Sequence, residues 1–295
     1  MILTGMGYPE YSSKKSKRMY SDHAKVGLLV VMEYLGKSFA EFARLLPSFV
    51  SVVRTAGIGT IPDESTLRKF RKRLDPKVLD KVLLFQSRMI TGTEDATVGI
   101  DATGFSTAHA SKHYMMRLRQ LGTENAVVRG FTKVTFASCV HTKAIFAADT
   151  ADSRTADIKR LEPLLDILAG SCRIGCVLAD KGYDAEYAHV MISERLGAEA
   201  VIPARENAPK RGTAEHRTKG KNRSRMKREL KDGTDAKAAY NMRSISETVN
   251  SMVKRVLGEV LEGRTDGARH SEVMFRCIAH NFRVGMELSS SGLFV

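Results

Sequence analysis

Two aspartates stand where their side chains could hold divalent metal ions. Asp101 follows the apolar run 97–100, and Asp180 follows the apolar run 177–179. Side chains at the ends of neighbouring strands in an α/β sheet meet at one edge, and hard cations such as Mg2+ prefer carboxylate oxygens. The alternative is that each aspartate caps a turn, because a glycine follows each of them closely. Taken singly, either aspartate is better explained as a turn residue.

A third acid, Glu247, lies in a segment with helical periodicity, residues 236–260. At about 100° per residue, four side chains fall within an arc of about 60°: Tyr240, Arg243, Glu247 and Lys254. Five apolar side chains fall on the opposite side: Ile245, Val249, Met252, Val253 and Val256. The pattern predicts a helix that packs its apolar face on a sheet and presents one carboxylate, two cations and an aromatic ring. A solvated polar face is the alternative.

The elements around these acids alternate between strand and helix. Strands are predicted at 97–102, 133–140, 144–147, 174–179 and 200–203, and helices at 76–90, 155–168, 185–196 and 236–260. This order is typical of an α/β domain with a mixed sheet and helices on both faces. An RNase H-like fold has this arrangement, as do several others.

The first part of the chain has a helical pattern. Residues 1–20 are polar and basic and indicate an arm or a frayed terminus. Helices are predicted from Asp22, from Ser38 with a capping box, and from 62 to 74. The basic last helix suits a helix-turn-helix-like DNA-binding module, and a helical packing or dimerisation domain is about as consistent. We therefore divide the chain into a helical N-terminal domain, 1–92, and an α/β domain, 93–295, with a basic insertion at about 205–235.

The charge balance favours a polyanionic partner. There are 47 Lys and Arg residues against 33 Asp and Glu, a formal net charge of +14, and nucleic acid is the first candidate for such a protein. Between Arg205 and Lys231 there are eleven basic residues and three Glu. We predict that this stretch contacts the DNA backbone, through Lys210, Arg211, Lys219, Lys221, Arg223, Arg225, Lys227 and Arg228. A disordered basic loop is the alternative.

Cysteine content and hydropathy bear on the compartment. The four cysteines do not form a disulfide framework, and the Cys172–Cys176 spacing has no second pair to complete a zinc site. The longest apolar run, 26–32, is too short to span a bilayer, and no secretory signal is visible. We expect a cytoplasmic protein with no membrane partner.

The four polar residues of the predicted helix also carry a family resemblance. Their spacing, Y-x2-R-x3-E-x6-K, resembles the signature of many insertion-sequence transposases of the DDE class, and it is matched without gaps. The segments 99–104 and 178–184 look like the family's first and second aspartate motifs, and 22–74 is similar to its helical N-terminal part. The resemblance covers nearly the whole chain.

This resemblance implies an RNase H-like catalytic domain that cleaves DNA at the element's ends and joins it to target DNA. Two Mg2+ ions would take part, with Mn2+ as a substitute. Asp101 would bridge both ions, Asp180 would hold one, and Glu247 the other. The DNA would be double-stranded, and synapsis of two ends implies a homodimer or larger assembly in the prokaryotic cytoplasm, at the nucleoid.

The resemblance also assigns roles to the cations and aromatic residues. Arg243 and Lys254 are candidates for phosphate contacts, and Tyr240, with Tyr183 as a second candidate, for positioning a terminal nucleotide. The chain has no tryptophan, which some members use to stabilise a flipped base; Tyr, Phe or Met could stack in its place, so the resemblance leaves open whether the second strand is cut through a hairpin or by another route. The alternatives are an inactive DNA-binding remnant or repressor, and an RNase H-like nuclease without strand transfer.

Overall fold

The computed structural model describes residues 2–11, 17–92, 95–108, 131–170, 173–205, 220–233 and 235–291. Six strands form one mixed sheet in the order β3-β2-β1-β4-β5, with β6 paired to β1. The strands are β1 (Ala96–Thr107), β2 (Phe131–Cys139), β3 (Ile145–Asp152), β4 (Ile174–Ala179), β5 (Glu199–Val201) and β6 (Val260–Leu261). The neighbours β1, β2 and β3 are antiparallel, whereas β4 and β6 run parallel to β1 and β5 runs parallel to β4.

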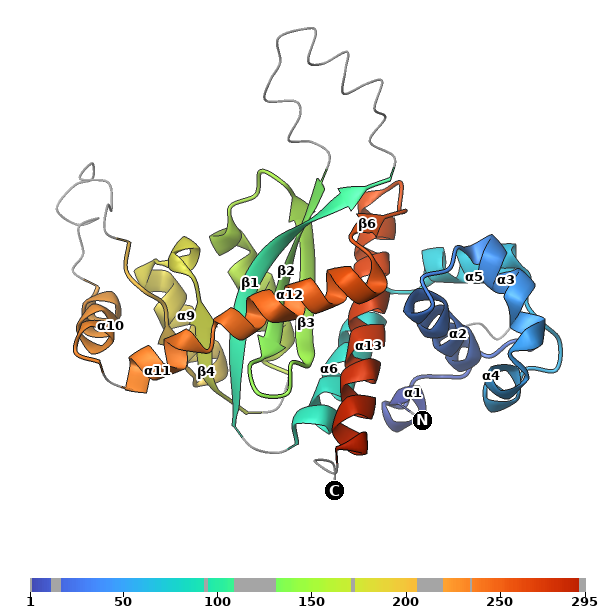
Figure 1. Cartoon of the computed structure of the whole chain (residues 1–295), viewed down its shortest axis with the longest axis horizontal. Coiled ribbons are helices and arrows are strands. Elements are labelled where there is room, and N and C mark those ends of the chain that lie inside the picture. Colours follow the sequence, from blue (N-terminus) through green and yellow to red (C-terminus); the bar gives the residue numbers. More distant parts are fainter. Residues whose placement is uncertain are drawn as a thin grey trace, which may run out of the picture.

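Helices cover both faces of this sheet (Figure 1). On one face, α8 (Leu161–Leu168) and α9 (Glu186–Leu196) pack with the apolar side chains of β1 and β4. Across the other face run α11 (Asp235–Asn241) and α12 (Ser244–Leu257), next to α10 (Lys221–Lys231). Short 3-10 turns lie at Leu46–Ser48, Asp157–Arg160 and Lys181–Tyr183. With the N-terminal helices, this arrangement confirms the predicted fold class.

The edge of the sheet at β3 is covered by two long helices, α6 (Pro76–Thr91) and α13 (Asp266–Ser290). An unpaired strand edge leaves backbone groups without partners. Here the Asn281 side chain accepts from the amide of Ile145 at 2.7 Å and donates to its carbonyl at 2.8 Å. The amide group of Asn281 thus takes the place of a neighbouring strand at this point.

The N-terminal helices are α1 (Ile2–Gly5), α2 (Asp22–Tyr34), α3 (Phe39–Leu45), α4 (Val50–Thr55) and α5 (Glu64–Arg73). The predicted capping box of Ser38 and Glu41 is present, and Ser21 rather than Asp22 caps α2. The expectation of a frayed start is wrong for α1, because Leu3 is buried and α1 packs on α6. The short helix α4 was not predicted.

Three further features differ from the sequence-based expectations. The single helix predicted at 236–260 is two helices, α11 and α12, separated by a turn at 242–243. Part of the basic stretch, 221–231, is the helix α10. The longest helix, α13, was not predicted at all. Within the described ranges, none of the helices is long and apolar enough to cross a bilayer.

Candidate active site

Asp101 lies on β1, and Asp180 directly follows the neighbouring parallel strand β4. Ile100 pairs with Ala179 in the β1–β4 register, so each aspartate comes one residue after this pair. Side chains alternate between faces along a strand, which places both on the face crossed by α12. Asp101 lies within β1 rather than at its end, since the strand continues to Thr107. Asp180 also caps a turn, because its Oδ1 accepts from the amide of Gly182 at 2.7 Å.

A close approach of helix to strand brings α12 over this position. A Cβ placed on Gly99 would lie 2.0 Å from Oγ of Ser246. A side chain at position 99 therefore requires the Ser246 side chain or the helix to move. Gly99 lies two residues before Asp101 and Ser246 directly before Glu247, so this contact bears on how near the helix comes to β1.

Glu247 lies in the first turn of α12 and is tied to Asp101 through an arginine. Nη2 of Arg243 is 2.7 Å from Oε1 of Glu247, and its Nη1 is 3.8 Å from Oδ1 of Asp101. The Glu247 side chain is 57% exposed, whereas that of Asp101 is 16% exposed. Arg243 therefore partly neutralises an acid on the strand and an acid on the helix.

Asn250 is a site residue that the sequence analysis missed. Its Nδ2 donates to Oδ2 of Asp101 at 2.7 Å, and Asn250 itself is buried. At about 100° per residue, Asn250 lies about 20° outside the arc of the four polar residues. Its helical position was the signal that could have identified it.

The pKa of Asp101 is raised to about 6, mainly by burial and also by the nearby charges of Glu247 and Asp180, against the lowering effect of Arg243. Asp101 thus experiences repulsion from both of the other acids. A divalent cation would relieve this repulsion, and carboxylate oxygens are the donors that Mg2+ prefers. The donor set therefore fits the expected cation. Within the described parts of the chain, no three acidic, His or Cys side chains are close enough together to form a metal-binding cluster, and Glu247 is directed to Arg243.

Comparison with known families decides the assignment. The family described as the transposase DDE domain matches residues 93–282. The chain belongs to this transposase family. Among solved structures, the chain resembles a piggyBac transposase synaptic complex with hairpin DNA, at 14% identity and a TM-score of 0.45, over 99% of this chain and 72% of that one. Comparison with curated proteins gives no match.

The remaining candidate site residues, Tyr240, Lys254 and Tyr183, have different surroundings. Tyr240 is on α11, where the Arg243 guanidinium lies 5.8 Å from the centre of its ring. Nζ of Lys254 lies 5.3 Å from the centre of the Phe105 ring. Tyr183, the second candidate for positioning a terminal nucleotide, is buried beneath the sheet, where its ring does not reach a nucleotide.

The basic residues predicted to contact DNA divide into three groups. Lys210, Arg211 and Lys219 lie outside the described residues. Arg223 forms two hydrogen bonds, at 2.6 and 2.5 Å, to the buried carboxylate of Asp184. Arg223 thus anchors α10 to the catalytic domain, and its guanidinium faces Asp184 instead of the surface predicted to contact DNA. The remaining four are exposed on α10: Lys221, Arg225, Lys227 and Arg228.

The start of α10 is fixed by a second acid. Oε1 and Oε2 of Glu186 accept from the amides of Asn222 and Arg223, each at 3.1 Å. These are the amides that a helix leaves unpaired at its N-terminus. Together with Asp184, Glu186 holds one side of α10 against the domain and leaves the other side to solvent.

Proposed function

We propose that this chain is the transposase of an insertion sequence, and that it cuts DNA at the element's ends and joins the freed ends to target DNA. Membership of the transposase DDE domain family supports the reaction class. The observation that best supports the site is that both Asp180 and Glu247 lie near enough to the largely buried Asp101 to raise the pKa of its carboxyl group. Strand cleavage and strand transfer on double-stranded DNA would then occur on the face crossed by α12.

Asp101, Asp180 and Glu247 are the residues proposed to hold two Mg2+ ions, with Mn2+ as a substitute. When bound, such ions would stabilise the negative charge on the attacking and leaving oxygens of an in-line phosphoryl transfer. Arg243 would stabilise negative charge on the phosphate, since it already lies beside two of the acids. Asn250 would hold the Asp101 carboxylate in a fixed orientation.

Contacts with DNA away from the acids are proposed for two regions. The exposed cations of α10 would neutralise backbone phosphates on one side of the site. Tyr240 would position a terminal nucleotide and Lys254 would contact phosphate, because they lie on α11 and α12 before and after Glu247. A homodimer or larger assembly is proposed from the need to hold two element ends together.

The alternatives are a nuclease of the same fold and an inactive DNA-binding remnant. The decisive experiment incubates the purified chain with the DNA that flanks its gene, Mg2+ or Mn2+, and a target plasmid. Joined products support transposition, cleavage without joining supports the nuclease, and binding without either reaction supports the remnant.

The matched variants are Asp101→Asn, Asp180→Asn and Glu247→Gln. The control is Asp166→Asn, which removes an exposed carboxylate paired with Arg195 on the opposite face of the sheet. Each triad variant should lose at least about a hundredfold in the rate of joining, because charge stabilisation in the transition state is lost. Full joining activity in Glu247→Gln would exclude the proposed triad.

A further inference from the structure

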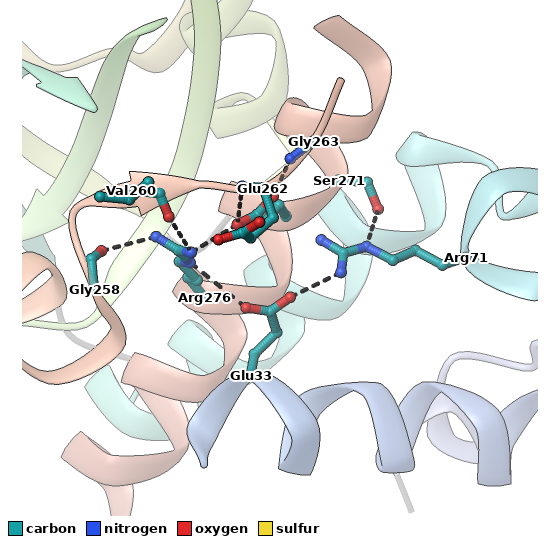
Figure 2. Close-up of polar contacts among 9 residues, drawn as sticks. Glu33, Arg71, Gly258, Val260, Glu262, Gly263, Ser271 and Arg276 are labelled. Carbon is teal, nitrogen blue, oxygen red and sulfur yellow. Dashed lines mark hydrogen bonds and ion pairs between the residues drawn. The ribbon is translucent and has the colours of Figure 1, made fainter. Parts of the chain in front are cut away.

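A buried set of ion pairs joins the N-terminal helices to the end of the helix that bears Glu247 (Figure 2). Glu33, on α2, lies between two arginines. Its Oε1 is 2.8 Å from Nη1 of Arg71, on α5, and its Oε2 is 3.5 Å from Nε of Arg276, on α13. The three side chains are at most 12% exposed. One carboxylate thus connects three helices.

Arg276 also binds the chain directly after α12. Its Nη1 donates to the carbonyl of Gly258, and its Nη2 to the carbonyl of Val260, both at 2.8 Å. Gly258 ends α12 with a positive φ of 91°, and Val260 begins β6. The planar guanidinium can reach both carbonyls at once, which a lysine ammonium does not do with the same geometry.

Glu272, one turn before Arg276 on α13, completes the contact. It accepts from Nη2 of Arg276 at 2.6 Å, from the amide of Glu262 at 3.0 Å and from the amide of Gly263 at 2.9 Å. Gly263 lies so close to α13 that a Cβ there would be 2.6 Å from the amide nitrogen of Arg269. The segment 258–263 is therefore held on both its carbonyl and its amide side.

This segment is connected to both parts of the proposed active site. It follows α12, whose first turn carries Glu247. Through β6 it pairs with β1, where Ser106 is opposite Val260, five residues after Asp101. A shift of 258–263 would therefore tilt α12 and displace the end of β1 together.

Buried ion pairs contribute little net stability to a fold, since apolar residues of similar size in the same place often stabilise it equally or more. They do require a fixed geometry, because each charge loses its compensation when a partner moves. Two arginines and two glutamates at this junction consequently favour one arrangement of α2, α5, α13 and the end of α12.

We propose that Arg276 is a positioning residue that fixes α12, and with it Glu247, relative to Asp101, and that Glu33 and Arg71 extend this constraint to the N-terminal helices. The inference rests on the proposed function for its catalytic consequence, and on the ion pairs alone for its structural one.

The test compares Arg276→Lys with Arg283→Lys, a partly exposed arginine on the same helix that pairs with Glu287. Duplex DNA from the element's end is used, with Ca2+ for binding and Mg2+ for cleavage. Arg276→Lys should slow cleavage at saturating DNA at least about tenfold, because small misplacements of catalytic groups are costly. Its Kd for DNA should change by less than about twofold, since no proposed DNA contact is altered. Arg283→Lys should change neither.

Amide hydrogen exchange provides a readout that does not depend on activity. In Arg276→Lys, exchange should accelerate in 244–263 and remain unchanged in β2 and β4. Equal acceleration throughout the chain, or a parallel loss of rate and DNA affinity, would mean a general structural role and would overturn the proposal. If the wild-type protein fails to cleave DNA, the proposed function fails, while the exchange pattern still decides the positioning role.

Glu33→Gln is the second test variant and replaces Arg276→Lys if that variant does not fold. It keeps a hydrogen-bond acceptor for Arg71 but removes the negative charge that faces Arg276. Its control is Glu287→Gln, an exposed partner on α13. Faster exchange in 258–263 and in α2, absent from the control, supports the coupling. Unchanged exchange in 258–263 would show that the N-terminal helices are not linked to the end of α12.

Discussion

The side-chain amide of Asn250 donates a hydrogen bond of 2.7 Å to Asp101, and so links the helix α12 directly to an acid on the central strand. A hydrogen bond to a carboxylate favours its charged form and lowers its pKa. Asn250 therefore opposes the effect of burial, which is the main cause of the raised pKa of Asp101, about 6.

Replacing Asn250 with alanine should raise the pKa of Asp101 further. A hydrogen bond to a charged group contributes about 1.5–3 kcal/mol, so we expect a rise of about one unit or more. The pKa can be followed by carbon NMR of the aspartate carboxyl group in the metal-free protein. Ser251→Ala, at an exposed neighbouring position of α12, is the control and should leave the titration unchanged. A lower pKa in Asn250→Ala would contradict the role given to Asn250.

Replacing Asp101 with asparagine should stabilise the metal-free protein at pH 7.5. Because its pKa in the folded protein is about 6, above the ordinary 3.8, the folded state binds the proton more tightly than the unfolded chain does. Stability therefore falls as the pH rises from about 4 to about 6, and the penalty is fully present above that range. In EDTA, the Tm should rise by a few degrees at pH 7.5 and much less at pH 4.5.

Asp166→Asn is the control for this measurement, because its carboxylate is 65% exposed and paired with Arg195. It should not reproduce the pH-dependent gain. A Tm of Asp101→Asn below that of the wild type at pH 7.5 would show that the charged carboxylate is not a source of instability.

The strands, and the positions of the three acids relative to them, were the parts that the sequence could predict. Apolar runs of strand length located β1, β2 and β4, and the i,i+4 spacing of Arg243 and Glu247 placed them on one side of a helix turn. Asp180 was predicted both as a site residue and as a possible turn cap, and its hydrogen bond to Gly182 shows that it caps the turn.

The parts that could not be predicted depend on tertiary contacts. In α13 every residue from Ser271 to Asn281 is buried, so the helix has no polar stripe to give a clear period. Its polar residues are satisfied by distant groups, such as Arg276 by Gly258 and Val260. Likewise, Arg223 looked like its neighbours in a basic run until the fold placed Asp184 beside it.

A methyl group at Gly99 should disrupt the contact between β1 and α12. It would lie 2.0 Å from Oγ of Ser246, and overpacking of this kind costs about 1–3 kcal/mol of unfolding free energy. Removing the oxygen with Gly99→Ala/Ser246→Ala should recover part of that loss. Denaturant unfolding of the two single variants and the double variant measures both effects.

Gly27→Ala is the matched control, because nothing lies within 4 Å of a Cβ at that position of α2. It should be neutral or should stabilise by up to about 1 kcal/mol, since alanine favours a helix more than glycine does. If Gly99→Ala proves as mild as Gly27→Ala, the close approach of α12 to β1 is not as tight as described.

The exposed cations of α10 should contribute to the salt dependence of DNA binding, whereas Arg223 should not. If Lys227 and Arg228 each neutralise one phosphate of duplex DNA, replacing both with alanine lowers the slope of log Kd against log salt by about 1.8. Lys77→Ala/Lys81→Ala removes the same charge from exposed positions of α6 and should leave the slope nearly unchanged. An equal fall in slope for both double variants would point to net charge, and not α10, as the source of the affinity.

Arg223→Ala should act differently, because it leaves the buried carboxylate of Asp184 unpaired and loosens α10. Faster hydrogen exchange of 221–231 would detect this loosening.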